Sequence, residues 1–288
     1  MARIGAIFSP YPNPPETLRE AVLAAEAAAV PELWLWEDCF RQSAFAAVSA
    51  ALAWTERLRL GIGISPMPLR NAALTAMEIA TVERMFPGRL LPGVGHGVQS
   101  WMVQVGKRVA SPLTLMREYV PAVRSLLAGD EVTAAGRYVT LDAVRLDYPP
   151  LSAPRVYAGA EGPKTLRLSG EVADGTVLDS RRTPAELAVQ AATVREGRAE
   201  SGRGGDHDIV AYIVAAFGDG AADRVATDFG DRDPEGRALT GSPQEVAEAS
   251  QAFFAAGVDA VILMPASGEP DLAAFYSSTG EVARLVCA

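Results

Sequence analysis

Two groups of polar residues directly follow short apolar runs, and their side chains are suited to proton exchange and polar ligand contacts. Glu37, Asp38 and Cys39 follow the run LWLW, and His96 follows a run that ends in GVG. A carboxylate or an imidazole can exchange protons near neutral pH. A neutral thiol, with a pKa of about 8.5, does so poorly. We therefore treat Asp38, His96, Cys39 and Glu37 as the candidate catalytic residues.

A third candidate is the stretch GAEGPK, which interrupts an apolar run just before a helical pattern resumes. Glycines allow close approach to the backbone, and proline suits the first position of a helix. Exposed amides at a helix start attract an anion, although a tight turn would explain the same letters. Its members are Gly159, Ala160, Glu161, Gly162, Pro163 and Lys164.

The elements that must position these residues alternate between short β-rich runs and longer helical patterns. Eight such repeats predict parallel βαβ units, and eight in this length favour a (β/α)8 TIM barrel of the α/β class over an open sheet. The predicted strands are 3–8, 33–36, 58–64, 90–94, 155–158, 175–178, 209–217 and 260–264. The predicted helices are 16–29, 43–55, 72–85, 111–127, 163–173, 184–201, 243–256 and 271–285. Three helix starts pair a capping hydroxyl with a proline, at Ser111, Thr183 and Ser242.

Two segments depart from this rhythm. Val132–Leu141 reads as a short β-hairpin insertion, and Gly218–Gly241 as a mobile loop with a short helix. Neither resembles a domain linker. We therefore predict a single TIM-barrel domain over residues 1–288, with trimmed loops.

In a barrel, active sites gather at the C-terminal ends of the strands, and this rule sorts the candidates. It places residues 37–39, 95–96 and 159–164 at one end of the barrel. The stretch LGIGIS, residues 60–65, lies at the same end, and its glycines indicate a bulge or close approach of a ligand. GVGHG matches a dinucleotide fingerprint only weakly, and we interpret it as a strand end close to a flat ligand. His207 precedes the seventh strand, so we expect it at the opposite end in a structural role.

Composition narrows the class of protein. The 288 residues carry a net charge of -9 with no basic run, which argues against nucleic acid as a partner. Only two histidines and two distant cysteines are present, so we expect no metal site and no disulfide framework. The N-terminal stretch lacks a long apolar segment, so we expect no membrane insertion and a cytoplasmic location.

Three motifs, taken in their order along the chain, resemble those of a known enzyme family. TERLRLGIGISPMPLR, GRLLPGVGHG and VYAGAEGPKTLRLSGEVADG resemble the luciferase-like oxidoreductase superfamily. They are more closely similar to the branch that uses the deazaflavin coenzyme F420, which includes methylenetetrahydromethanopterin reductase. The resemblance runs from about residue 4 to residue 180 and resumes weakly near GSPQEVAEAS.

The resemblance implies a TIM barrel, often a homodimer, that binds its coenzyme at the C-terminal end. It implies that the Gly63–Ile64 bond is a non-prolyl cis peptide that lies against the coenzyme ring. It also implies that residues 159–164 bind the coenzyme phosphate. The cofactor-binding residues it implies are Asp38, Gly63, Ile64, Ser65, Gly95, His96, Gly159, Ala160, Glu161, Gly162, Pro163 and Lys164.

One departure from the family pattern concerns proton transfer. Asp38 aligns with the Asp of an Asp-His pair, but Cys39 stands where that pattern commonly has His. His96 is a candidate substitute, while Glu37 is an acid candidate or a partner of Arg41. Arg70 lies where the pattern contacts either the coenzyme tail or a neighbouring helix.

The resulting prediction is an F420-dependent oxidoreductase that transfers a hydride between the deazaflavin and a small-molecule substrate. One alternative is an FMN-dependent luciferase-like monooxygenase. The other is a barrel that binds a ligand without catalysis.

Overall fold

Parallel strands form a closed ring in the computed structural model, which describes residues 2–287. Met1 and Ala288, the two ends of the predicted domain, lie outside the described residues. The strands of the ring are β1 (Arg3–Ile7), β2 (Glu32–Leu35), β3 (Arg59–Ile62), β4 (Ser65–Pro66), β5 (Leu90–Leu91), β6 (Gly93–Gly95), β9 (Tyr157–Gly159), β10 (Gly175–Leu178), β11 (Asp208–Phe217) and β13 (Ala260–Pro265).

The register of the strands closes the ring. β13 pairs with β1, placing Ala260 opposite Arg3. β3 pairs with β5, and β4 pairs with β6. Since β3 and β4 are successive parts of one stretch of chain, and β5 and β6 flank Pro92, each couple acts as one strand. Counted in this way, and with the side strand β12 set aside, the sheet is the predicted eight-stranded barrel.

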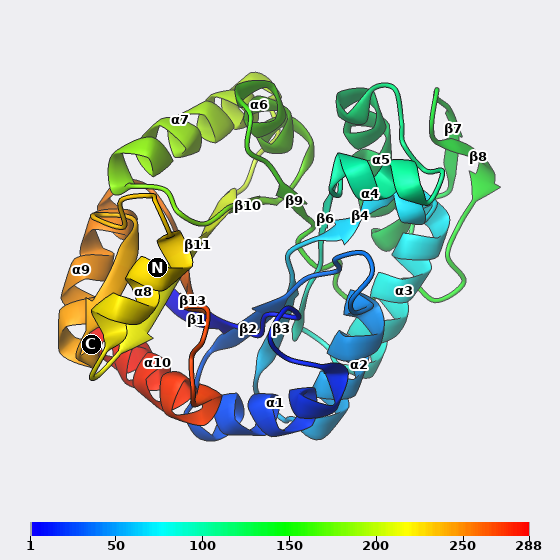
Figure 1. The fold of residues 1–288 in the computed structure, drawn as a ribbon. Coiled ribbons are helices and arrows are strands. Elements are labelled where there is room, and N and C mark those ends of the chain that lie inside the picture. The colour runs from blue at the N-terminus through cyan, green and yellow to red at the C-terminus, as the bar shows by residue number, and fades with distance from the viewer. Residues whose placement is uncertain (1, 288) are drawn as a thin grey trace.

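Helices surround the ring as an outer layer, and α10 returns to lie beside α1 (Figure 1). Side-chain oxygens cap several of their N-termini, and Thr183 and Ser242 form full capping boxes at their predicted positions. The helices of this layer are α1 (Leu18–Ala27), α2 (Ala44–Trp54), α3 (Ala72–Met85), α5 (Pro112–Leu127), α6 (Pro163–Val172), α7 (Pro184–Glu200), α9 (Pro243–Ala255) and α10 (Leu272–Cys287). Within residues 2–287, no helix is both long enough and apolar enough to cross a bilayer.

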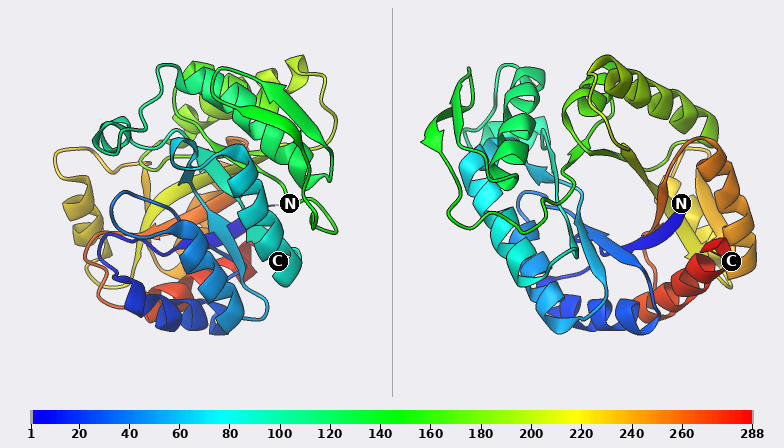
Figure 2. Two further views of the ribbon diagram at one scale, coloured as in Figure 1. Left: turned by 90° about the vertical axis from the view of Figure 1, so that its right-hand side faces the viewer. Right: turned by 180° about the vertical axis from the view of Figure 1, so that it is seen from behind.

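Smaller elements fill the connections. The predicted hairpin is present as β7 (Val132–Ala135) and β8 (Thr140–Val144), at the edge of the molecule in Figure 2. α4 (Gln99–Gln104) was not predicted, and single 3-10 turns precede α1 and α3. Gly218–Gly241 was predicted as a loop with a short helix. The helix is present as α8 (Ala221–Phe229), and the segment also forms β12 (Ala238–Gly241), which was not predicted and pairs with β11.

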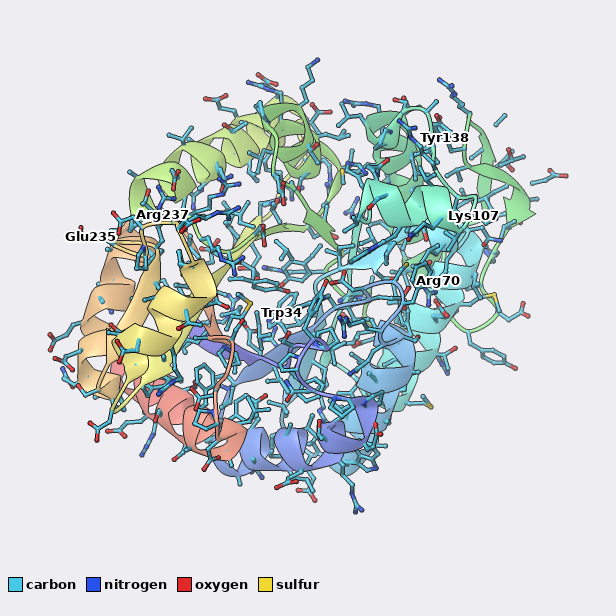
Figure 3. The ribbon with its side chains drawn as sticks, viewed as in Figure 1. Trp34, Arg70, Lys107, Tyr138, Glu235 and Arg237 are labelled. Carbon is cyan, nitrogen blue, oxygen red and sulfur yellow. The ribbon has the colours of Figure 1, made fainter. Side chains whose placement is uncertain are left out.

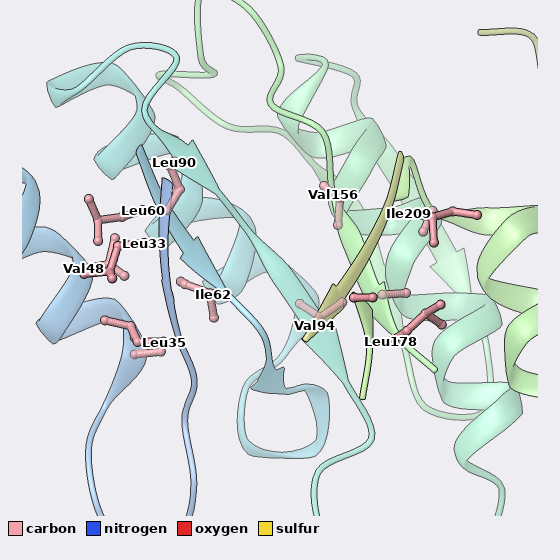
Figure 4. Close-up of a cluster of buried hydrophobic side chains, with 14 of the residues drawn as sticks. Leu33, Leu35, Val48, Leu60, Ile62, Leu90, Val94, Val156, Leu178 and Ile209 are labelled. Atoms are coloured by element: carbon pink, nitrogen blue, oxygen red, sulfur yellow. The ribbon is translucent and has the colours of Figure 1, made fainter. Parts of the chain in front are cut away.

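Two apolar layers hold the barrel together, because alternate residues of each strand point to opposite faces. Leu33 and Leu35 of β2 pack outward against the helices with the residues drawn in Figure 4. Trp34, between them, points into the barrel and lies near the centre of the ring in Figure 3. Its ring meets Tyr157 edge-on, with centroids 5.5 Å apart. Burying one such aromatic side chain stabilises the fold by roughly 4–6 kcal/mol.

Candidate active site

The C-terminal ends of the strands bring the predicted site residues together. Asp38 follows β2, and His96 follows β6. Gly63 and Ile64 lie between β3 and β4, and Ser65 is the first residue of β4. Residues 159–164 follow β9 and enter α6. Because the ring is parallel, all four segments lie at one end of the barrel, as predicted.

The peptide bond between Gly63 and Ile64 is cis, as the resemblance implied. The side chain of Ile64 packs against two glycines on neighbouring strand ends. A Cβ at Gly95 would lie 2.8 Å from Cγ1 of Ile64, and one at Gly159 would lie 2.9 Å from its Cγ2. Both glycines were predicted to face a ligand. The structure shows that both glycines make room for Ile64, and their contact with a ligand stays a prediction.

The Gly63 carbonyl is held from inside the barrel. It accepts a hydrogen bond of 3.3 Å from the hydroxyl of Tyr212. A Cβ at Gly63 would fall 1.8 Å from that same hydroxyl oxygen, so any larger residue would displace Tyr212. Tyr212 in turn packs edge-on to Trp34, which ties the loop after β3 to the barrel core.

Asp38 is fixed by two aromatic side chains. The indole Nε1 of Trp36 and the hydroxyl of Tyr11 both donate to its Oδ2, at 2.9 Å and 2.7 Å. Among residues 2–287, no hydrogen bond reaches Oδ1. Burial and the hydrogen bond to Asp38 raise the pKa of Tyr11 to about 12, and the guanidinium of Arg41 stacks 4.5 Å from its ring centroid. Sequence reasoning missed Tyr11; its position just past the first strand was the available signal.

Cys39 lies beside this carboxylate, partly buried. Burial and the negative charges of Glu37 and Asp38 raise the pKa of its thiol. The peptide bond that follows it, Cys39–Phe40, is also cis. The thiol is therefore neutral at pH 7 and a weak proton exchanger.

Glu37 is buried, and both of its carboxylate oxygens are occupied. Nη1 and Nη2 of Arg70 bind Oε1 at 2.5 Å and Oε2 at 3.0 Å, and the Ala44 amide at the start of α2 donates to Oε2. Pairing with Arg41, one of the two roles considered for Glu37, is not what the structure shows, since Arg70 takes that place. Arg70 also binds Glu78 of α3 at 3.1 Å and donates to Oγ of Ser65. Glu37 thus positions the loops after β2 and β4.

His96 is partly buried, and both nitrogens of its ring are buried without a hydrogen-bond partner in the described chain. Burial lowers the pKa of the imidazole, so it is neutral at pH 7. A neutral imidazole offers one donor and one acceptor. Leaving a buried polar group unpaired costs about 1–3 kcal/mol, and a bound polar group would remove that cost.

The N-terminus of α6 lacks a capping side chain. Gly162 is its N-cap residue and Pro163 is at its first position, as predicted. Side chains cap α3, α5, α7 and α9, while α1, α2, α4 and α8 lack a side-chain cap as α6 does. At α6 the space is also open, because a Cβ at Gly162 would meet no atom within 4 Å. Lys164 is exposed next to this open space. Free amides, a helix dipole and a lysine form an arrangement that suits a phosphate group.

Acidic side chains border the same helix start. Burial and the nearby charge of Asp179 raise the pKa of Glu161, while Arg182 opposes that shift. Arg181, also after β10, is engaged elsewhere, since it binds Asp228 of α8 at 3.0 Å. The mouth of the barrel near α6 therefore includes a carboxyl group that protonates more readily than usual.

The opposite end of the barrel holds two cavities of about 440 Å³ and 810 Å³. His207 lines the larger one, at the end where the sequence placed it, and none of the predicted catalytic or cofactor residues lines either cavity. In the part of the chain that the structure describes, no group of three His, Cys, Asp or Glu side chains is arranged to hold a metal ion.

Comparison with known proteins gives a family and several relatives. A sequence profile of the family described as luciferase-like monooxygenase matches residues 1–227. The 5,10-methylenetetrahydromethanopterin reductase of Methanolobus tindarius is 29% identical over 199 residues, covering 69% of this chain and 60% of the reductase. The F420-dependent glucose-6-phosphate dehydrogenase of Nakamurella multipartita is 32% identical over 143 residues, covering 48% and 42% of the two chains. The chain matches about three fifths of the length of the reductases.

Solved structures share the fold over nearly the whole chain. An F420-dependent secondary alcohol dehydrogenase in complex with an F420-acetone adduct has a TM-score of 0.87 at 23% identity, covering 99% of both chains. The coenzyme F420-dependent tetrahydromethanopterin reductase of Methanopyrus kandleri has a TM-score of 0.81 at 21% identity, covering 97% of both. A type II Baeyer-Villiger monooxygenase from Pseudomonas putida in complex with FMN has a TM-score of 0.80 at 19% identity, covering 99% of this chain and 98% of that one.

Proposed function

Because this chain belongs to the luciferase-like monooxygenase family, we propose that it is a coenzyme F420-dependent oxidoreductase acting on a small organic substrate. The relatives named for F420 support this choice within the family. The observation that carries it is the uncapped start of α6, where Gly162 leaves open space above free amides. When bound, the deazaflavin supplies hydride transfer to or from the substrate.

The residues of this chain divide the remaining work. The amides that follow Gly162, with Lys164, would hold the phosphate. Ile64, seated on Gly95 and Gly159, would support the ring at the cis peptide. His96 would pair its free nitrogens with a polar atom of the bound molecules.

Asp38 is the residue that we assign to proton handling. Trp36 and Tyr11 fix Oδ2, which leaves Oδ1 to accept a proton or a hydrogen bond from the ligand side. Cys39, with its raised pKa, stays protonated and takes no share of that work. In this arrangement Tyr11 and Trp36 orient the carboxylate of Asp38.

A direct comparison of the two coenzymes tests the proposal. The purified chain is titrated with F420 and, separately, with FMN, and the quenching of tryptophan fluorescence is recorded. We expect saturable binding of F420 in the micromolar range and binding of FMN at least tenfold weaker. A flat F420 titration would remove the proposal.

An FMN-dependent monooxygenase is the second candidate. The family description and the fold shared with an FMN-bound monooxygenase favour it. It predicts the reverse order of affinities, together with oxygen uptake in the presence of reduced FMN. A barrel that binds without catalysis, suggested by Cys39 in place of histidine, predicts F420 binding with no turnover.

We also infer a homodimer located in the cytoplasm. The exposed side chains of Leu74, Met77 and Met85 lie along α3, and an apolar stripe of this kind suits a contact between subunits. Cys39 and Cys287 are free thiols, which suits a reducing compartment. Light scattering of the purified chain tests the dimer, and a Met77→Lys variant should shift it toward the monomer.

A further inference from the structure

Arginine is the most frequent residue in the lining of the larger cavity at the N-terminal end of the barrel. It measures about 810 Å³, and five arginines and three aspartates line it. Over the whole chain the balance is reversed, with 26 basic and 35 acidic residues. Positive charge is therefore concentrated here, at the end opposite the candidate active site. The arginines are Arg3, Arg155, Arg195, Arg198 and Arg203.

Backbone carbonyls hold two of these side chains in place. Nη2 of Arg195 donates to the carbonyl of Gly257 at 2.6 Å, and Nη2 of Arg198 donates to that of Gly204 at 2.6 Å. A Cβ at Gly257 would lie 2.3 Å from Nη1 of Arg195, so glycine is needed for this contact. Carbonyls fix the position of a guanidinium but leave its charge uncompensated. These two side chains of the cavity wall are therefore held in place before any ligand binds, and they keep their positive charge.

Ion pairs neutralise only part of the wall. Arg3 binds Asp208 at 2.6 Å, and Arg203 binds Asp174 at 2.6 Å. Within residues 2–287, Arg155, Arg195 and Arg198 have no carboxylate at ion-pair distance.

Two further aspartates line the cavity without an ion pair to these arginines. Asp259 accepts a hydrogen bond from the Ile209 amide, and Asp206 is exposed at the rim. Arg155 is exposed, forms no hydrogen bond in the described chain, and lines both cavities. Its guanidinium is therefore the one most available to a ligand.

His207 also lines this cavity. Its Nε2 lies 2.8 Å from Oγ1 of Thr176, while its Nδ1 is buried without a partner among residues 2–287. Burial is the largest cause that lowers the pKa of the imidazole to about 4; the charges of Arg198 and Arg203 lower it further, and those of Asp174 and Asp208 oppose the shift. The ring is therefore neutral at pH 7 and adds a polar group, not a charge, to the wall.

We propose that this cavity is a second anion-binding site, which takes a small phosphorylated metabolite with at least two negative charges. Guanidinium groups match phosphate oxygens in geometry and charge, and several of them converge here. The volume lies within the usual range for small-molecule sites. The site is distinct from the α6 helix start and does not depend on the proposed coenzyme.

Inorganic pyrophosphate is the probe for this site. The full chain is titrated with it by calorimetry and by thermal shift, at constant ionic strength set with chloride. We expect saturable binding and an upward shift of Tm. Arg155→Gln should weaken the affinity at least tenfold, and Arg195→Gln should weaken it as well. Arg145→Gln, an exposed arginine outside both cavities, is the matched control and should change nothing.

Lys164→Ala separates this site from the start of α6, and binding should persist in that variant. Arg155 makes no contact that the fold needs, so its variant should keep the Tm of the unliganded protein. The proposal is overturned by an absence of saturable binding, by equal affinity in Arg155→Gln and the parent chain, or by loss of binding in Lys164→Ala.

Discussion

The hydroxyl of Tyr11 donates a hydrogen bond of 2.7 Å to Oδ2 of Asp38, joining the loops that follow β1 and β2. Trp36 donates to the same oxygen from within the second loop. Two donors on one oxygen hold the carboxylate in a single orientation and direct Oδ1 away from them. Asp38 is therefore positioned by its aromatic neighbours.

Tyr11→Phe removes this hydrogen bond and keeps the ring under Arg41. A hydrogen bond to a charged group contributes about 1.5–3 kcal/mol, so we expect kcat/KM of the F420-dependent reaction to fall roughly 10- to 100-fold. Steady-state kinetics of the parent chain and the variant measures this effect.

The control for this change is Tyr148→Phe. Tyr148 is likewise exposed and lies under an arginine, Arg84, but it is in the segment that follows the hairpin. Turnover should match that of the parent chain. Equal kcat/KM for Tyr11→Phe and the parent chain would show that Asp38 does not need Tyr11.

Gly162→Ala tests the phosphate position at α6. The added methyl group meets no protein atom, so the free energy of unfolding should stay within about 1 kcal/mol of the parent value. It would occupy the space where a phosphate approaches the amides. We therefore expect the Kd for F420 to rise roughly tenfold, about 1.4 kcal/mol, in a fluorescence titration.

Gly204→Ala is the matched glycine control, because a Cβ there also meets nothing within 4 Å and the residue lies at the other end of the barrel. It should leave F420 affinity unchanged. If Gly162→Ala binds F420 as tightly as Gly204→Ala does, the phosphate lies elsewhere.

The barrel was predictable because its signals are local. Apolar runs alternate with helical patterns, and the caps at Thr183 and Ser242 occur just where α7 and α9 begin. In segment 218–241 the predicted short helix is present, whereas β12 was not predicted, because its pairing with β11 leaves no local signal. Ala221, Val225 and Phe229 are four residues apart and form the buried face of α8.

The site was only partly predictable, because several of its contacts join residues that are distant in sequence. The pair of Glu37 and Arg70 spans 33 residues, and nothing in either motif indicates it. Similarly, Gly95 and Gly159 are explained by the side chain of Ile64, which packs between two other strand ends. The order of the strands predicts that these residues lie at one end of the barrel, but it does not predict which side chains contact one another there.

The depressed pKa of His207 predicts a pH dependence of stability. Its folded value is about 4, against an ordinary 6.5, so the unfolded chain takes up the proton first as the pH falls. This contribution to the free energy of unfolding is present above pH 6.5 and is lost as the pH falls toward 4. Between pH 7 and pH 5 we expect a loss of roughly 1–2 kcal/mol from this residue.

Urea unfolding of the parent chain and of His207→Gln, at pH 7 and pH 5, measures this contribution. The variant should lose less stability between the two pH values. His96, whose pKa is also lowered, loses stability in the same way as the pH falls. Glu161, whose pKa is raised, contributes a change in stability of the opposite sign. Both are unchanged in the variant, so equal losses in the two proteins would contradict the assignment to His207.

Arg70→Gln tests the ion pair that joins the loop after β2 to the one after β4. Glu37 is buried, and the substitution leaves its carboxylate without a positive partner in that position. Removing one member of a buried pair costs about 3–5 kcal/mol, so urea denaturation should show a loss of that order. Arg117→Gln is the control, because Arg117 is 60% exposed in its pair with Glu171 and should cost less than about 1 kcal/mol. Similar losses in the two variants would mean that other contacts fix the loops at this end of the barrel.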